Sequence, residues 1–160
     1  MFLFIFFSLY MMKNFEELEW FINNNKNWIE LLSGHPYNIK IIQSKTKPNL
    51  YILKYNQYSS DFHDPIVCQC RGTVVKYENG VGSIYCAPYI KFFNYNEELA
   101  ADINWETTKC REKIDGWLIK GLVLPDHGIE FFSNGSFIEK NNIIISPDGI
   151  SGNIIFRTLV

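Results

Sequence analysis

The chain has 160 residues, with 15 Lys and Arg against 17 Asp and Glu, which gives a formal charge of −2. This length suits one domain of ordinary size and leaves little room for a second core. Hydrophobic residues make up 47% of the chain and charged residues 20%, a balance that excludes an intrinsically disordered protein. The charge also excludes a broadly basic nucleic-acid scaffold, so any contact with a polyanion must come from a local patch.

Residues 1–12 are expected to be an apolar extension in front of a domain at 13–160. Met1–Tyr10 are almost wholly apolar, but they lack the basic region and cleavage site of a secretory signal and are too short to cross a bilayer. The spacing of the four cysteines does not match a zinc site, and these residues are Cys68, Cys70, Cys86 and Cys110. We therefore expect a cytoplasmic protein with reduced thiols, no membrane contact and no protein metal site.

An amphipathic helix is expected at the start of the domain. Asn14 followed by Glu17 fits an N-cap with a helper carboxylate three residues later. Apolar residues then recur near the helical period, at Phe15, Leu18, Phe21, Ile22, Ile29 and Leu32. Because the pattern stops at Ser33-Gly34, just before Pro36, the sequence predicts one helix that ends there.

After Pro36 the pattern becomes that of β-strands. Short β-rich runs are expected at Ile39–Ile42, Leu50–Tyr55, Arg71–Tyr77, Ser83–Cys86, Leu118–Leu124, Glu130–Phe132, Phe137–Glu139 and Ile143–Ile145. Turn residues such as Lys47-Pro48-Asn49 and Asn79-Gly80 separate neighbouring runs, which should therefore pair antiparallel. Asn96–Ala101 is expected to form a second, short helix. The predicted fold class is α+β, an N-terminal amphipathic helix followed by a mainly antiparallel sheet.

The strongest local signal for chemistry is a K-x-D-G tetrapeptide at Lys113-Ile114-Asp115-Gly116. A lysine amine can attack the α-phosphorus of a nucleoside triphosphate and hold the nucleotide as a phosphoramidate. The attack needs a neutral amine, so nearby cations or burial must lower the lysine pKa. The glycine lets the backbone pass close to a nucleotide. For the tetrapeptide alone, the alternative is a surface lysine before an ordinary Asp-Gly turn.

Two upstream segments make this motif more informative. One is Arg71-Gly72, leading into a strand, and the other is P-x-x-K-F-F-N-x-x-E at Pro88–Glu97. Their order before K-x-D-G resembles the nucleotidyltransferase domain of the RNA ligase 1 family of T-even bacteriophages. Phe132–Phe137 is similar to the glycine-serine turn that follows the nucleophile strand in that family. The resemblance runs from about Ile39 to Phe137 and implies a truncated, ATP-grasp-like ligase domain.

By this resemblance, Lys113 would be the adenylylated nucleophile, and Asp115 and Gly116 would complete the catalytic motif. The implied reaction is ATP-dependent joining of RNA ends through a lysyl-AMP intermediate, with Mg²⁺ as charge neutraliser. AMP would pass to a 5′-phosphate, and a 3′-hydroxyl would then displace it. The implied partners are therefore the ends of a broken tRNA or another RNA.

The resemblance also implies a set of nucleotide-binding residues. Arg71 would lie near the phosphates of ATP or the 5′-phosphate of RNA, because the planar guanidinium can donate two parallel hydrogen bonds to a phosphate. Lys91 would supply a cation beside the triphosphate. One of Phe92 and Phe93 would pack near the base, and the other would belong to the core.

The later motifs of the family have no match after Lys113, where Glu130 and Glu139 are the only glutamates. Missing lysines near the α-phosphate would leave both the nucleophile and the phosphates without stabilising cations. We therefore expect slow or no ligation by this chain alone, as a gene fragment or as a half that needs a second chain. One alternative is an inactive remnant that binds a nucleotide or an RNA end, and another is an unrelated α+β structural protein.

Overall fold

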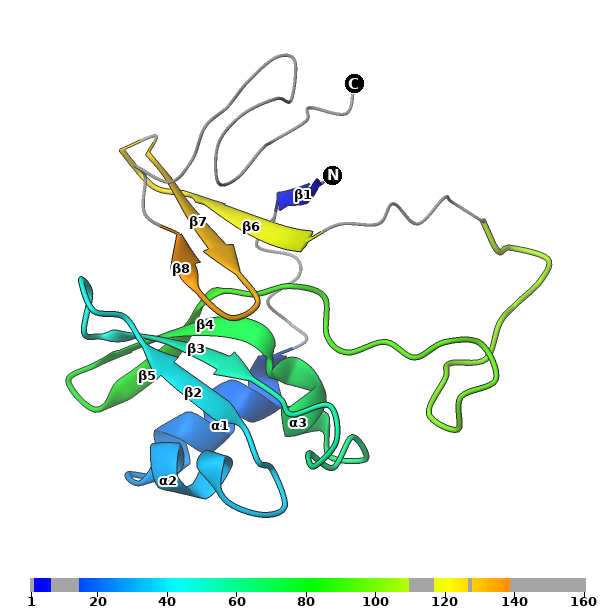
Figure 1. The fold of residues 1–160 in the computed structure, drawn as a ribbon, viewed down its shortest axis with the longest axis horizontal. Helices are drawn as coiled ribbons and strands as arrows, with labels where there is room; N and C mark the ends of the chain where they lie inside the picture. Colours follow the sequence, from blue (N-terminus) through cyan, green and yellow to red (C-terminus); the bar gives the residue numbers. More distant parts are fainter. Residues whose placement is uncertain (1, 7–14, 110–116, 127, 139–160) are drawn as a thin grey trace.

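The computed structural model describes residues 2–6, 15–109, 117–126 and 128–138. Its elements in chain order are β1 (Phe2–Phe6), α1 (Glu16–Asn24), α2 (Trp28–Ser33), β2 (Lys40–Gln43), β3 (Leu50–Lys54), α3 (Pro65–Gln69), β4 (Arg71–Glu78), β5 (Val81–Cys86), β6 (Trp117–Val123), β7 (Ile129–Ser133) and β8 (Phe137–Ile138). The strands form a central sheet of order β2-β3-β4-β5 and an outer sheet of order β1-β6-β7-β8. The helices lie against one side of the central sheet and the outer sheet lies on the other (Figure 1). The predicted α+β class with mainly antiparallel strands is confirmed.

The larger core lies between the helices and the central sheet. Successive residues of a strand face opposite sides, and Leu53 of β3 and Val75 of β4 face the helices. There they meet α1 and α2, whose apolar residues Leu18, Ile22 and Trp28 are almost fully buried. The Trp28 ring packs edge-on against Tyr51 at 5.4 Å and tilted against Tyr77 at 5.6 Å.

A smaller core joins the two sheets. Ile52 of β3 and Val74 of β4 alternate with the helix-facing residues and point to the outer sheet. They pack with Cys86 of β5 against Phe132 of β7, all four being buried. The central sheet is therefore apolar on both faces, and the outer sheet covers the face that the helices leave free.

The single predicted helix is two helices, so that prediction was wrong. α1 ends at Asn24 and α2 begins at Trp28. Three consecutive asparagine side chains, those of Asn23, Asn24 and Asn25, each donate a 2.8 Å hydrogen bond to the carbonyl oxygen four residues earlier. Such side-chain bonds compete with continued helix formation, which explains the break after Asn24.

The start of α1 is held by a residue that the sequence analysis did not select. Asn14, the expected N-cap, lies outside the described residues; Phe15 occupies the N-cap position and makes no side-chain cap bond. Instead the buried amide of Gln69 accepts from the backbone N–H of Leu18 at 2.9 Å and donates to Glu17 at 2.6 Å. Gln69 ends the unpredicted helix α3, so α3 positions the first turn of α1.

Six predicted strands are present within a few residues of their expected bounds, as β2, β3, β4, β5, β6 and β7, and β8 covers the start of a seventh. The β4–β5 turn at Asn79-Gly80 has positive φ at both residues, 53° and 82°, as a two-residue hairpin requires. The helix expected at Asn96–Ala101 was wrong: the segment forms turns, and Asn96 has a left-handed φ of 67°. The expected strand Ile143–Ile145 lies outside the described residues.

The apolar extension at 1–12 contributes a strand to the outer sheet. Phe2–Phe6 form β1, which pairs in parallel with Trp117–Gly121 of β6. Cys68, Cys70 and Cys86 are free thiols, and Cys110 lies outside the described residues. Within the part of the chain that the structure describes, no helix is both long enough and apolar enough to span a bilayer.

Candidate functional site

The predicted catalytic residues Lys113, Asp115 and Gly116 lie outside the described residues. The described chain resumes at Trp117, directly after this motif, with strand β6. The predicted nucleotide-binding residues Arg71, Lys91, Phe92 and Phe93 are described, so they can be placed in the fold.

Arg71 and Phe92 form a stacked pair. The guanidinium carbon of Arg71 lies 4.5 Å from the centre of the Phe92 ring, a distance at which the cation and the ring attract each other. The Phe92 side chain is 57% exposed. The structure therefore joins the Arg-Gly segment to the K-F-F-N segment, and it leaves an aromatic ring open to solvent beside a cation.

Lys91 belongs to a separate aromatic cluster. Its Nζ lies 4.6 Å from the centre of the Phe93 ring and 5.5 Å from that of Phe62. The Phe93 ring packs edge-on against Phe62 at 6.2 Å, and the Lys91 backbone N–H donates to the carbonyl oxygen of Cys68 at 2.8 Å. Lys91 thus anchors its loop on α3, and Phe93 is the more buried of the two phenylalanines.

A hollow of about 540 Å³ opens beside Arg71, and we call it the basic hollow. Its walls come from β2, β3, the loop after β3, the start of β4 and the β7–β8 turn. The lining residues are Lys40, Lys54, Tyr55, Asn56, Gln57, Tyr58, Arg71 and Asn134. None of these described residues carries a carboxylate, so the charged side chains in the described wall, Lys40, Lys54 and Arg71, are all cationic. Lys91 is not part of this wall.

Lys40, Lys54 and Arg71 form a cation row across three neighbouring strands. Lys40 of β2 pairs in register with Lys54 of β3, and Lys54 pairs with Arg71 of β4. Among the described residues, no carboxylate or carbonyl oxygen bonds to the side-chain nitrogens of these residues. The row therefore presents unpaired donors to the hollow, and Phe92 stacks on the guanidinium at one end.

A β-bulge at Gly72 places Arg71 in this row. Leu53 pairs with Thr73 and Lys54 with Arg71, so Gly72 is the extra, unpaired residue of β4. Its φ of +90° is open to glycine and strained for other residues. Without the bulge, the alternation of β4 would put Arg71 on the opposite side of the sheet. The glycine of the Arg-Gly segment thus has a defined structural role.

The bulge also brings the two sheets into close contact. A Cβ added to Gly72 would lie 2.5 Å from the Cα of Asn134 in the β7–β8 turn. The side-chain oxygen of Asn134 is buried and has no hydrogen-bond partner in the described structure. Asn134 therefore forms a wall of the basic hollow that is fixed against the backbone of β4.

Lys120 is a buried lysine that the sequence analysis missed. It lies in β6, is fully buried, and its Nζ donates a hydrogen bond to the carbonyl oxygen of Gly72. The pKa of Lys120 is lowered to about 8, chiefly by burial; the nearby Cys86 acts in the opposite direction, and Arg71 in the same direction as burial. The available signal was a lone lysine within the apolar run Trp117–Val123. The lysine ties the strand after the K-x-D-G motif to the strand that carries Arg71.

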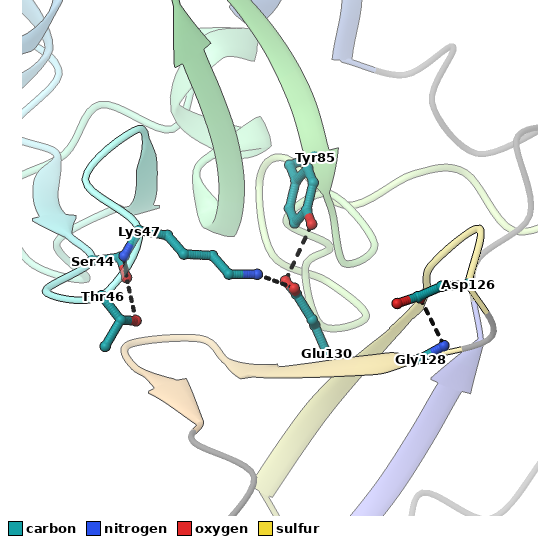
Figure 2. A network of polar contacts seen from close by, with 7 residues as sticks. All are labelled: Ser44, Thr46, Lys47, Tyr85, Asp126, Gly128 and Glu130. Carbon is teal, nitrogen blue, oxygen red and sulfur yellow. Dashed lines mark hydrogen bonds and ion pairs between the residues drawn. The ribbon is translucent and has the colours of Figure 1, made fainter.

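A second hollow, of about 440 Å³ and mostly apolar, lies between the β2–β3 turn and strands β7 and β8. Figure 2 shows the polar network at its side, where Glu130 of β7 accepts from Lys47 and from the hydroxyl of Tyr85. The Tyr85–Glu130 contact is 3.2 Å. Burial, and then the negative charge of Glu130, raise the pKa of Tyr85 to about 12. This network links the central sheet to the outer sheet beside the second hollow, which does not contain the cation row.

Replacing Glu130 with glutamine should lower the pKa of Tyr85, because the charge that opposes its ionisation is removed. The value should stay above the ordinary one of about 10, since burial is the larger cause. Alkaline titration of tyrosinate absorbance measures this, with Tyr85→Phe identifying the Tyr85 component. Glu16→Gln, at an exposed position in α1, is the control and should leave the titration unchanged. An identical titration in Glu130→Gln would contradict the contact.

The basic hollow combines unpaired cations, an arginine fork and aromatic rings on its wall and rim. Such a combination suits a ligand that carries phosphate and a planar base.

Compared with models of protein families, with curated proteins and with solved structures, the chain matches none of them. Its function must therefore be inferred from its own residues.

Proposed function

We propose that the protein is an ATP-dependent, RNA-ligase-like nucleotidyltransferase that acts on RNA 5′-phosphate and 3′-hydroxyl ends. The observation that carries this proposal is the stacking of Arg71 on Phe92 at the rim of the basic hollow. The two motifs that single out these residues are separate in sequence and adjacent in space. A guanidinium can bind phosphate through two parallel donors, and an exposed ring offers a face to a base.

In this proposal, the two sheets are the nucleotide-binding part of an ATP-grasp-like ligase domain. The position of β6 supports it. β6 begins directly after Gly116, and its Lys120 bonds to the carbonyl oxygen of Gly72, next to Arg71. The chain that follows the proposed nucleophile is therefore tied to the strand that carries the proposed phosphate ligand.

The proposed reaction begins with attack of the neutral Lys113 amine on the α-phosphorus of ATP. A P–N bond forms, the P–O bond to pyrophosphate breaks, and pyrophosphate leaves. No group of three or more His, Cys, Asp and Glu side chains lies together among the described residues. In the proposed reaction, Mg²⁺ would enter with ATP and neutralise charge on its phosphate groups.

The test is transfer of label from ATP to the protein. The purified chain, incubated with α-labelled ATP and Mg²⁺, should acquire AMP in an acid-labile, base-stable bond. Lys113→Ala should reduce this label by at least about a hundredfold, because no other group would replace the nucleophile. Lys109→Ala removes an exposed lysine of the same segment and is the matched control, expected to keep the label. Equal labelling of Lys113→Ala and the wild type would contradict the proposal.

The alternative is a binding module that holds a nucleotide or an RNA end without turnover. The cation row favours it, since these residues could bind phosphate whether or not Lys113 reacts. In the same experiment, absence of label together with measurable binding of ATP or RNA would support the module.

A further inference from the structure

The second hollow is a part of the interface between the two sheets that the protein does not fill. Beside it, Val74 of β4 and Cys86 of β5 pack with Phe132 of β7 and close the interface as the smaller core. The hollow itself keeps about 440 Å³ between the β2–β3 turn and strands β7 and β8. Protein interiors contain few voids larger than a water molecule, whereas a concavity of this volume has the size of a small-ligand site.

Apolar side chains form one wall of the second hollow. Leu50 and Phe132 lie at its base and are each only 2% exposed. Other large apolar side chains of this wall are only half-buried, and they are Ile42, Ile129, Phe131, Phe137 and Ile138. These side chains present apolar surface that a ligand can remove from water, and each ligand methylene buried there should strengthen binding about fourfold.

The other wall of the second hollow is polar and is formed by the β2–β3 turn, of which Ser44–Lys47 all line the hollow. From this turn, Lys47 reaches Glu130 of β7 and forms an ion pair at the side of the hollow (Figure 2). The hydroxyl of Tyr85 donates to the same carboxylate at 3.2 Å. Glu130 is therefore neutralised and hydrogen-bonded by the protein itself, and its side chain is only 15% exposed.

Lys45 supplies the charge that remains in this wall. The described lining contains two lysines, Lys45 and Lys47, against one carboxylate, that of Glu130, which gives a net charge of +1. Lys45 is exposed, and it forms no ion pair or hydrogen bond with another described residue. The second hollow thus combines an apolar wall with one unpaired cation on the opposite wall.

We propose that the second hollow binds an apolar monocarboxylate of the medium-chain fatty acid class. The hydrocarbon chain lies against the half-buried apolar wall, and the carboxylate faces the ammonium group of Lys45. A neutral apolar molecule would leave this ammonium group without a partner, and an apolar amine would be repelled by it. The second hollow shares no lining residue with the basic hollow, so this inference does not depend on the proposed function.

The first test measures the contributions of the tail and the head of the ligand. By isothermal titration calorimetry of the full chain, below the concentration at which decanoate forms micelles, decanoate should bind at least about a hundredfold more tightly than butyrate, because it buries several more methylenes. Lys45→Gln should weaken decanoate binding by about fivefold, as loss of an exposed ion pair allows. Lys26→Gln removes an exposed lysine outside the hollow and is the matched control, expected to keep the wild-type affinity.

Two folding controls accompany these titrations. Lys45 and Lys26 are both exposed, so the two variants should unfold at the wild-type temperature. With unfolding unchanged, equal affinity of the wild type and Lys45→Gln for decanoate would overturn the assignment of the carboxylate. Equal affinity of the wild type for decanoate and butyrate, or no binding of either acid, would overturn the inference as a whole.

The second test locates the ligand by nuclear magnetic resonance of isoleucine methyl groups. Decanoate should shift the methyl signals of Ile42, Ile129 and Ile138, which line the hollow, and the shifts should saturate at one equivalent. Ile22, which is 2% exposed and lies in the larger core, is the internal control and should not shift. Shifts confined to other isoleucines, or shifts that grow without saturation, would mean binding of an adventitious additive only and would overturn the inference.

Discussion

Replacing Gly72 with alanine should lower the free energy of unfolding by about 3 kcal/mol. Two causes add. A residue with a side chain is strained at the φ of +90° that Gly72 adopts. Its Cβ would also lie 2.5 Å from the Cα and 2.8 Å from the carbonyl oxygen of Asn134. Because these are backbone atoms, they cannot move away without shifting the β7–β8 turn.

The control for this variant is Gly80→Ala in the β4–β5 turn. Gly80 has a similar φ of +82°, but a Cβ there would meet nothing within 4 Å. It should therefore lose about 1 kcal/mol, the strain alone. Urea-induced unfolding measures both changes, provided that the slope of the unfolding free energy against urea concentration is the same in the variants and the wild type. If the two variants lose the same small amount, the close approach of β4 to the β7–β8 turn is refuted.

Much of the central sheet could be predicted from the sequence, because its strands alternate regularly and are separated by strong turn signals. Asn79-Gly80 fixed both the position and the type of the β4–β5 hairpin. The break between α1 and α2 could not be predicted from the apolar pattern, which continues in phase across it. The break depends on the side chains of Asn23, Asn24 and Asn25, which bond back to the helix backbone.

The basic hollow could be predicted only at Arg71. This residue stands in a recognisable Arg-Gly pair, whereas Lys40 and Lys54 stand alone in their strands. They join Arg71 only through the register of β2, β3 and β4, and that register depends on the bulge at Gly72. A bulge shifts pairing by one residue, and a shift of one residue moves every following side chain to the other face. Site residues assembled in this way leave no local sequence pattern.

Gly72 and Lys120 both take part in contacts between the outer sheet and the start of β4. The absence of a side chain at Gly72 lets the β7–β8 turn approach β4, and the amine of Lys120 holds the Gly72 carbonyl oxygen from β6. Both contacts fix the backbone next to Arg71. The outer sheet therefore takes part in positioning the cation row, although the three cations themselves belong to the central sheet.

Replacing Lys120 with methionine should remove a pH dependence of stability that the wild type shows between about pH 8 and 10.5. The folded pKa of Lys120 is about 8 and the unfolded value is 10.5, so between these values the unfolded chain binds more protons. Wild-type stability from this group therefore rises with pH across this window, by up to about 3 kcal/mol, and is lost as the pH falls back through it. Loss of the donor to Gly72 adds a constant penalty of about 1–3 kcal/mol in the variant.

The measurement is the difference in unfolding free energy, wild type minus Lys120→Met, at pH 7.5 and at pH 10. It should shift by about 2 kcal/mol in favour of the wild type at the higher pH. Burial raises the pKa of Cys86 to about 11, and this thiol acts in the opposite direction, but it is present in both proteins and largely cancels. Lys26→Met, at an exposed position, should show no shift with pH. Parallel pH profiles for the wild type and Lys120→Met would mean that the amine of Lys120 is solvated, and that the tie between β6 and the Gly72 carbonyl oxygen does not form.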